Sequence, residues 1–131
     1  MAQEAIETIK INEIEYVRKD SIPDYQPAEK LGNTPFVLIR TYSAGVHFGY
    51  LAKRESTVAG IEVTLKHARR IYTWEGAATL SQIAMEGVKN PLASGNKFTM
   101  VVDSIDLIAI EIMPITKSAA ENLSRVKIWK M

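Results

Sequence analysis

The residue types best suited to ligand chemistry gather in one segment of the chain, residues 66–87. Arg69 and Arg70 lie just before Tyr72 and Trp74 in this segment. An arginine guanidinium is a planar fork that binds two phosphate oxygens at once, and aromatic rings stack on nucleotide bases. The segment therefore predicts a site for a small phosphorylated ligand that carries a base. Two ordinary roles compete with this interpretation, because paired arginines also lie in solvent at strand ends and aromatic side chains also pack in cores.

A helix start is expected directly after these residues. Gly76, Ala77 and Thr79 belong to the sequence EGAAT, whose small side chains would leave backbone amides open to an anion. The segment is not a P-loop, because no Lys-Ser or Lys-Thr pair follows a glycine at the required spacing. Small residues would equally allow the helix to pack closely on a sheet, and both interpretations stay open.

A strand is expected over residues 68–74 and must position the arginines and aromatics. Alternate side chains of a strand point to opposite faces. Arg70, Tyr72 and Trp74 are therefore predicted to share one face, while Arg69 lies on the other. A face with one arginine and two aromatic rings suits a ligand better than it suits a core.

Three residues of a predicted hairpin complete the candidate site. A β-rich run over residues 36–42 and a second over 46–51 flank a three-residue turn that contains glycine, which is typical of a hairpin. We expect Arg40, Tyr42 and His47 to border the same ligand. The ordinary alternatives are a surface ion pair for the arginine and a hydrogen-bonded core position for the histidine.

The rest of the pattern predicts an α+β domain. Short strands alternate with few helices, which favours a bent antiparallel sheet or small barrel with one central helix and a short C-terminal helix. Further strands are expected over 61–66, 98–102 and 105–113, with Asp103 and Ser104 as a turn. The helices are expected over 77–87 and from Thr116 or Ser118 onward.

The N-terminal part of the chain differs in composition and predicts a second unit. Residues 1–34 are rich in charges and prolines, and we expect an extended arm there; its short apolar run fits a helix or a strand equally well. Residues 35–131 are expected to form one ligand-binding domain.

Composition excludes several function classes. The net charge is +1, so attraction to duplex DNA has little basis and any anion site must be local. There is no cysteine, which excludes disulfides and thiolate zinc sites. The two histidines lack the spacing of a metal motif, so we expect no metal and no cofactor. No apolar run reaches the roughly 20 residues that span a bilayer, and a cytoplasmic protein is expected.

Three segments carry a resemblance to a known group of proteins. YSAGVHFGYL at 42–51, RRIYTWEGAATLSQIAMEGVKNP at 69–91 and the final VKIWKM resemble a small, mostly phage-encoded family of uncharacterised proteins. Its motif is an Arg-Arg pair, aromatics around a tryptophan, and then G-A-x-S/T-L-x-Q-x-A-x-x-G. This chain departs from the motif at Thr73, where more aromatic character is expected. The residues that match the motif are Arg69, Arg70, Trp74, Gly76, Ala77, Thr79, Leu80, Gln82, Ala84 and Gly87.

The family is similar to the viral sponges that sequester cyclic nucleotide or cyclic ADP-ribose signals of bacterial anti-phage systems, as the Thoeris anti-defence proteins do. The resemblance implies a non-enzymatic homo-oligomer in the cytoplasm of an infected bacterium, with ligand sites between subunits. Other interpretations stay open: a protein-binding inhibitor of a host factor or a structural phage protein, a single-stranded nucleic-acid binder, and an enzyme that uses His47, Asp103 or Asp106.

Overall fold

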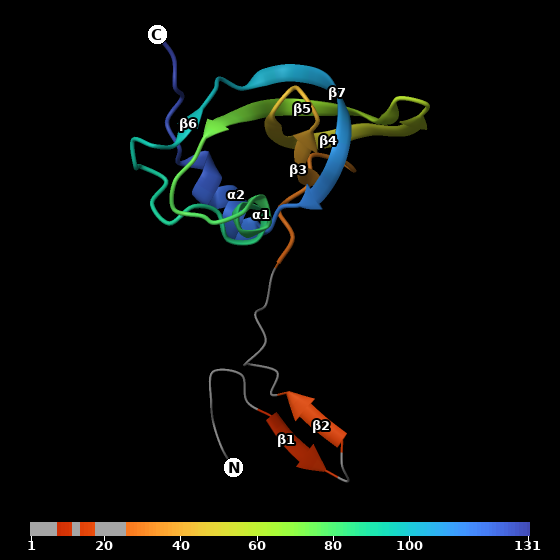
Figure 1. Ribbon diagram of the computed structural model, residues 1–131, viewed down its shortest axis with the longest axis vertical. Helices are drawn as coiled ribbons and strands as arrows, with labels where there is room; N and C mark the ends of the chain where they lie inside the picture. Colours follow the sequence, from red (N-terminus) through yellow and green to blue (C-terminus); the bar gives the residue numbers. More distant parts are fainter. Residues whose placement is uncertain (1–7, 12–13, 18–25) are drawn as a thin grey trace.

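The computed structural model describes residues 8–11, 14–17 and 26–131 (Figure 1). Parts of the expected arm, residues 1–7, 12–13 and 18–25, lie outside the described residues. The elements in chain order are β1 (Thr8–Ile11), β2 (Ile14–Val17), β3 (Phe36–Thr41), β4 (Val46–Thr57), β5 (Gly60–Thr73), α1 (Leu80–Glu86), β6 (Lys97–Phe98), β7 (Val102–Pro114) and α2 (Lys117–Ser124). The strands β1 and β2 pair with each other antiparallel.

Four strands close into a ring. β3 pairs with both β4 and β7, and β5 pairs with the same two strands, all of them antiparallel. The short β6 extends the sheet beyond β5. Figure 1 shows the ring, with both helices beside one side of it. The predicted α+β fold with a strongly bent antiparallel sheet is therefore confirmed.

Long irregular strands make this closure possible. The sequence predicted separate strands over 61–66 and 68–74, but β5 runs through both as a single element. His67 lies between them with φ of +50°, and the β4–β5 register shifts near it. Such bulges bend a strand and increase its twist without ending it. The same correction applies to residues 102–114, where Asp103 and Ser104 lie inside β7 and form no turn.

Gly49 on β4 allows the two longest strands to approach closely. A Cβ at this position would lie 2.9 Å from the Lys66 carbonyl oxygen and 3.0 Å from the Ala68 Cα. These neighbours are backbone atoms, which cannot turn aside as a flexible side chain would. A side chain at position 49 would therefore push β4 away from β5.

The strands carry a separate apolar cluster on each face. Val37 and Ile39 of β3 join residues of β5 and β7 in a cluster made by strands alone, which fills the ring. Leu38 points to the opposite face, where it packs with Ile83 of α1 and Leu123 of α2. The ring is thus filled inside and covered on one outer side by the helices.

Each helix begins with a threonine cap. Thr79 caps α1, which is shorter than the predicted 77–87, and Thr116 caps α2, one of the two predicted starts. The Thr116 hydroxyl accepts a hydrogen bond from Ala119 N–H at 3.1 Å and donates one to the Met85 carbonyl at 2.7 Å. Neither described helix has the length and apolar character needed to cross a membrane.

The C-terminal segment returns to the sheet. Ile128 forms a parallel bridge with Phe98 of β6, and the backbone N–H of Trp129 donates to the Phe98 carbonyl at 2.8 Å. This pairing places the end of the chain beside β6, which itself lies beside β5. Side chains from residues 70–72, 97 and 127–129 therefore come to one region.

Candidate functional site

The adjacent arginines of β5 have different environments. Arg69 is only 6% exposed, whereas Arg70 is exposed to solvent. Arg69 donates to the carbonyls of Thr99 at 2.7 Å and Val126 at 2.7 Å, with a longer contact to Leu123 at 3.5 Å. Its guanidinium carbon also lies 5.2 Å from the centre of the Phe98 ring.

These contacts correct the prediction for Arg69. Its donors are directed to backbone carbonyls near β6 and at the end of α2, so they do not face a phosphate. Burial lowers the pKa of its guanidinium from the ordinary value. Arg69 therefore connects β5 to the C-terminal part of the chain and positions the segment that carries Trp129.

Trp74 likewise does not offer the exposed stacking surface that the sequence predicts. It follows the end of β5, packs against the cluster beneath the helices, and its indole N–H donates to the Ala77 carbonyl at 3.0 Å. Strand alternation no longer applies once the strand has ended. The shared face of Tyr72 and Trp74 was therefore a wrong prediction.

Tyr72 instead stacks on Trp129. The two ring centres are 4.9 Å apart and the planes differ by 17°. Tyr72 is 60% exposed and Trp129 is 47% exposed, so the stack is open to solvent. The Lys97 ammonium lies 5.4 Å from the centre of the Trp129 ring, within the range of a cation–π contact.

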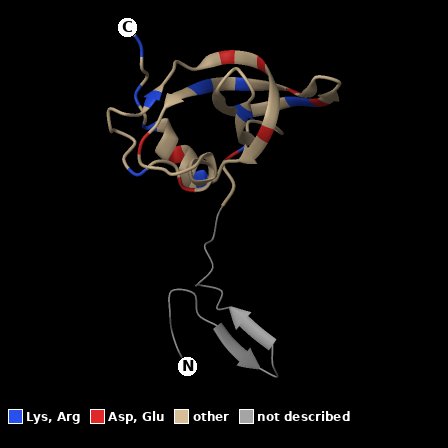
Figure 2. Ribbon diagram, in the orientation of Figure 1, with Lys and Arg blue, Asp and Glu red and all other residues tan. Residues whose placement is uncertain are grey.

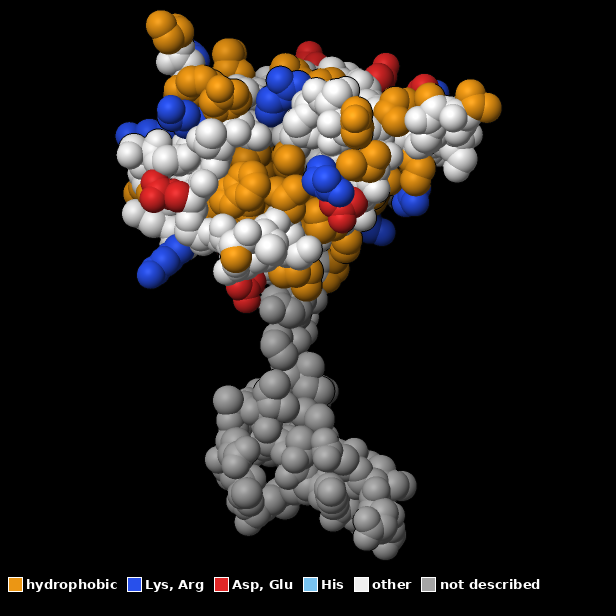
Figure 3. Space-filling view, viewed as in Figure 1, with side chains coloured by type: hydrophobic (Ala, Val, Ile, Leu, Met, Phe, Trp, Pro, Cys, Tyr) orange, Lys and Arg blue, Asp and Glu red, His pale blue; other side chains and the backbone are white. Residues whose placement is uncertain are grey.

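A cavity of about 260 Å³ adjoins this stack. It is lined by Trp129, Lys97 and Lys127, together with Ile128, Asn96 and the loop residues 91–94. We call Tyr72, Trp129, Lys97 and Lys127 the aromatic platform. Figure 3 shows hydrophobic and basic side chains next to one another near the C terminus, and Figure 2 shows Lys and Arg on the ribbon of the same region.

The loop beside the cavity is held by polar contacts. The Glu75 carboxylate accepts from Gly95 N–H at 2.7 Å, and Glu75 N–H donates to the Asn96 side chain at 2.9 Å. Asn96 is itself buried and donates to the Asn90 carbonyl at 2.9 Å. These hydrogen bonds give the cavity wall a defined shape.

Arg70 lies two residues before Tyr72 on the exposed side of β5. It lines a smaller cavity of about 180 Å³ with His47, Thr99 and Met100. Its guanidinium reaches toward the β3–β4 turn, because Arg70 Nε would lie 3.7 Å from a Cβ at Gly45. Of the predicted arginines, Arg70 is the one that is exposed and lines a cavity.

His47 is a buried, hydrogen-bonded residue. It is 2% exposed, and its Nε2 donates to the Ala44 carbonyl at 2.8 Å. Burial is the main reason why the pKa of His47 lies below its ordinary value, and the positive charge of Arg70 acts in the same direction. The neutral ring therefore holds the β3–β4 turn in place beside Arg70.

Arg40 and Tyr42 do not join the aromatic platform. Arg40 forms an ion pair with Glu111 of the neighbouring β7. Tyr42 is 91% exposed at the start of the β3–β4 turn. The ordinary alternative for the arginine, a surface ion pair, is the one that the structure contains.

The turn before α1 is a structural element. Gly76 has φ of +85°, and its carbonyl accepts from Lys89 N–H at 2.9 Å. The Thr79 hydroxyl accepts from Gln82 N–H at 3.1 Å, and Ala78 N–H donates to the Gln82 side chain at 2.8 Å. Of the amides in this turn, that of Ala78 is occupied within the protein, and Gly76 and Thr79 support the fold through their own contacts.

Residues 34–123 match the family described as a domain of unknown function, DUF6948. The match covers well over half of the chain. The chain belongs to this family. No curated protein and no solved structure matches it significantly.

The DUF6948 match contains the ring, α1, all of α2 except Ser124, and the platform residues Tyr72 and Lys97, but it ends before Lys127 and Trp129. Neither Trp129 nor either lysine is among the site residues that the sequence predicts. The only signal for them was the basic and aromatic ending VKIWKM. This ending contributes to the platform only because it pairs with β6 in the folded chain.

The described residues contain no cluster of side chains that could form a metal centre. Across residues 8–11, 14–17 and 26–131, no group of three or more His, Asp or Glu side chains is close enough to hold a metal ion. Asp106 accepts a hydrogen bond from the Thr64 hydroxyl at 2.6 Å, across the β5–β7 pair. That contact gives Asp106 a structural role on the outside of the ring.

Proposed function

We propose that this protein binds a small phosphorylated nucleotide signal and holds it unchanged. The observation that supports this most is the exposed Tyr72–Trp129 stack beside a cavity lined by Lys97 and Lys127. A nucleotide needs a flat surface for its base and cations for its phosphates, and the platform offers both. In the cell, the protein would then act as a phage anti-defence sponge for a cyclic nucleotide or cyclic ADP-ribose-type signal.

The expected stacking energy and the local positive charge are compatible with binding of a nucleotide. Stacking on an aromatic side chain contributes roughly 1–3 kcal/mol per base. Lys97 and Lys127 provide positive charge at one place in a chain whose net charge is only +1. Arg70 lies elsewhere on β5, and its planar guanidinium could bind two oxygens of a second phosphate. Attraction is thus local, which favours a compact anion over long duplex DNA.

We further propose that the protein acts as a homo-oligomer in the cytoplasm of the infected host, with the ligand enclosed between subunits. In the single chain both platform rings are about half exposed. A second copy placed over them would exclude water and strengthen the contacts with the phosphates. Exposed Met100, which lines the Arg70 cavity, and the adjacent exposed Val101 would supply apolar area for that contact.

Isothermal titration calorimetry tests the binding proposal. The protein is titrated with cyclic dinucleotides and with cyclic ADP-ribose isomers, and we expect saturable binding of at least one of them. W129A and Y72A should each weaken that binding about tenfold, because each breaks the Tyr72–Trp129 stack, and W129A also removes part of the cavity wall. K97Q and K127Q should weaken it and reduce its salt dependence, whereas K53Q, at an exposed lysine paired with Glu55 and Glu62, should not. A folded protein that binds none of these compounds would refute the proposal.

A protein-binding role is the second candidate. It is favoured by the apolar side chains exposed on β7 and just before it, since Met100, Val102 and Ile110 are each about half exposed. Apolar surface of this kind often marks a protein interface. If the protein is an inhibitor of a host factor or a structural phage protein, V102D and I110D should abolish binding of its protein partner, and W129A should leave that binding unchanged.

A further inference from the structure

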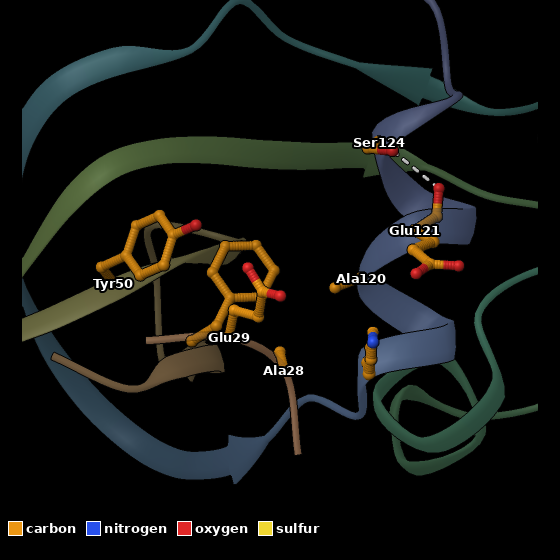
Figure 4. A pocket seen from close by; sticks show the side chains of 8 residues that line it. Ala28, Glu29, Tyr50, Ala120, Glu121 and Ser124 are labelled. Carbon is orange, nitrogen blue, oxygen red and sulfur yellow. Dashed lines mark hydrogen bonds between the residues drawn. The ribbon is translucent and has the colours of Figure 1, made fainter. Parts of the chain in front are cut away.

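A second cavity, of about 320 Å³, lies between α2 and the β3–β4 side of the sheet (Figure 4). None of its lining residues belongs to the aromatic platform. It is lined by Ala28, Glu29, Phe36, Tyr50, Lys117, Ala120, Glu121 and Ser124. These residues come from the chain before β3, from β3 and β4, and from α2.

Two aromatic rings form the apolar side of this cavity. The centres of Phe36 and Tyr50 are 4.9 Å apart and their planes are tilted by 52°. Phe36 also packs edge-on against Phe48, and Tyr50 packs edge-on against His67. The rings are therefore held from behind. The face of an aromatic ring carries partial negative charge and attracts a cation.

Two carboxylates complete the cavity. Figure 4 shows Glu29 on the same side of the space as Tyr50, and Glu121 on α2, on the other side. Within residues 26–131, neither carboxylate forms an ion pair or a side-chain hydrogen bond, and both residues are exposed. Lys117 is the one cation among the eight lining residues. The lining therefore carries one more negative than positive charge.

We propose that this cavity binds a small organic ammonium ion with an apolar body, of the quaternary ammonium type. The aromatic rings would contact the alkyl groups, and the carboxylates of Glu29 and Glu121 would balance the charge. An anion would meet two carboxylates and one ammonium group, which disfavours it. This proposal does not rest on nucleotide binding, and either one can fail without the other.

The test uses choline and its neutral isostere 3,3-dimethylbutan-1-ol, which differ in charge but hardly in shape. Amide chemical shifts of the ¹⁵N-labelled full chain are followed as each compound is added. We expect saturable shifts at Ala28, Ala120 and Ser124 with choline, with millimolar affinity, and far smaller shifts with the alcohol. Equal binding of both compounds, or no binding of choline, would overturn the proposal.

Variants separate the charge from the cavity. E29Q and E121Q should each weaken choline binding by up to about fivefold, the range of an exposed charge pair, and K117Q should strengthen it. E86Q, at an exposed glutamate on α1 outside the cavity, is the matched control and should leave binding unchanged. Because all four positions are exposed, the fold should be preserved. Choline binding that is equally strong in E29Q, E121Q and E86Q would also overturn the proposal.

Discussion

Replacement of Arg69 by lysine tests the role that the structure gives to this buried residue. Arg69 reaches the Thr99 carbonyl next to β6 and the Val126 carbonyl beyond α2, both at 2.7 Å. A lysine keeps the charge, but its compact ammonium lacks the fork that spans two carbonyls in fixed directions. R69K should therefore lose at least one of these bonds and leave a buried carbonyl without a donor.

The size of the effect follows from these contacts. A hydrogen bond with a charged partner contributes about 1.5–3 kcal/mol, and an orphaned buried carbonyl costs about 1 kcal/mol or more. The contact to Leu123 at 3.5 Å adds little. We expect R69K to lower the free energy of unfolding by about 3 kcal/mol, which corresponds to a decrease in Tm of about 12 °C for a domain of this size.

Urea denaturation of R69K and R70K provides the assay. R70K is the matched control, because Arg70 is exposed and its loss should change stability by no more than about 0.5 kcal/mol. Limited trypsin digestion gives a second readout, since a released C-terminal segment should be cut faster after Lys127. If R69K were as stable as R70K and equally resistant to trypsin, the structural role of Arg69 would be refuted.

Three further predictions concern the fold around the site. G49A should destabilise the protein by about 1–3 kcal/mol in urea denaturation, because its Cβ would meet backbone atoms of β5, whereas S56A on the exposed end of β4 should be neutral. T116V should cost about 1–3 kcal/mol, since it removes the α2 cap and leaves the Met85 carbonyl without its donor; equal stability of T116V and S118A would contradict this. Because the pKa of His47 is lowered in the folded protein, the unfolded chain takes up a proton on this ring near its ordinary pKa of about 6.5, at a higher pH than the folded protein does. Stability should therefore fall with pH below this value more steeply in the wild type than in H47Q, and parallel curves would show that His47 does not titrate on unfolding.

Local patterns were sufficient for much of the fold. The runs over 36–42 and 46–51 form the predicted hairpin of β3 and β4, and the Thr116 cap starts α2 as one of the two expected positions. Alternation also placed Arg70 and Tyr72 on one exposed face. These features depend on residues that are close in sequence, which is why pattern and structure agree there.

The errors arose where distant parts of the chain meet. Arg69 is buried against carbonyls that are 30 to 57 residues away along the chain. The residues next to Arg69 in the sequence do not indicate these contacts. Trp129 joins Tyr72 only because the end of the chain pairs with β6. The strand alternation that linked Tyr72 to Trp74 failed because β5 ends at Thr73. The platform is therefore a product of tertiary structure and could not be predicted from spacing.

A depletion experiment tests the central claim most directly. The full chain is mixed with cyclic dinucleotides and cyclic ADP-ribose isomers and passed through a filter that retains the protein, and the free and retained small molecules are identified by mass spectrometry after heat denaturation. We predict that one compound is retained by the wild type, is recovered with unchanged mass, and passes through the filter with W129A. Retention of none of them, or recovery of a cleaved product, would contradict the account.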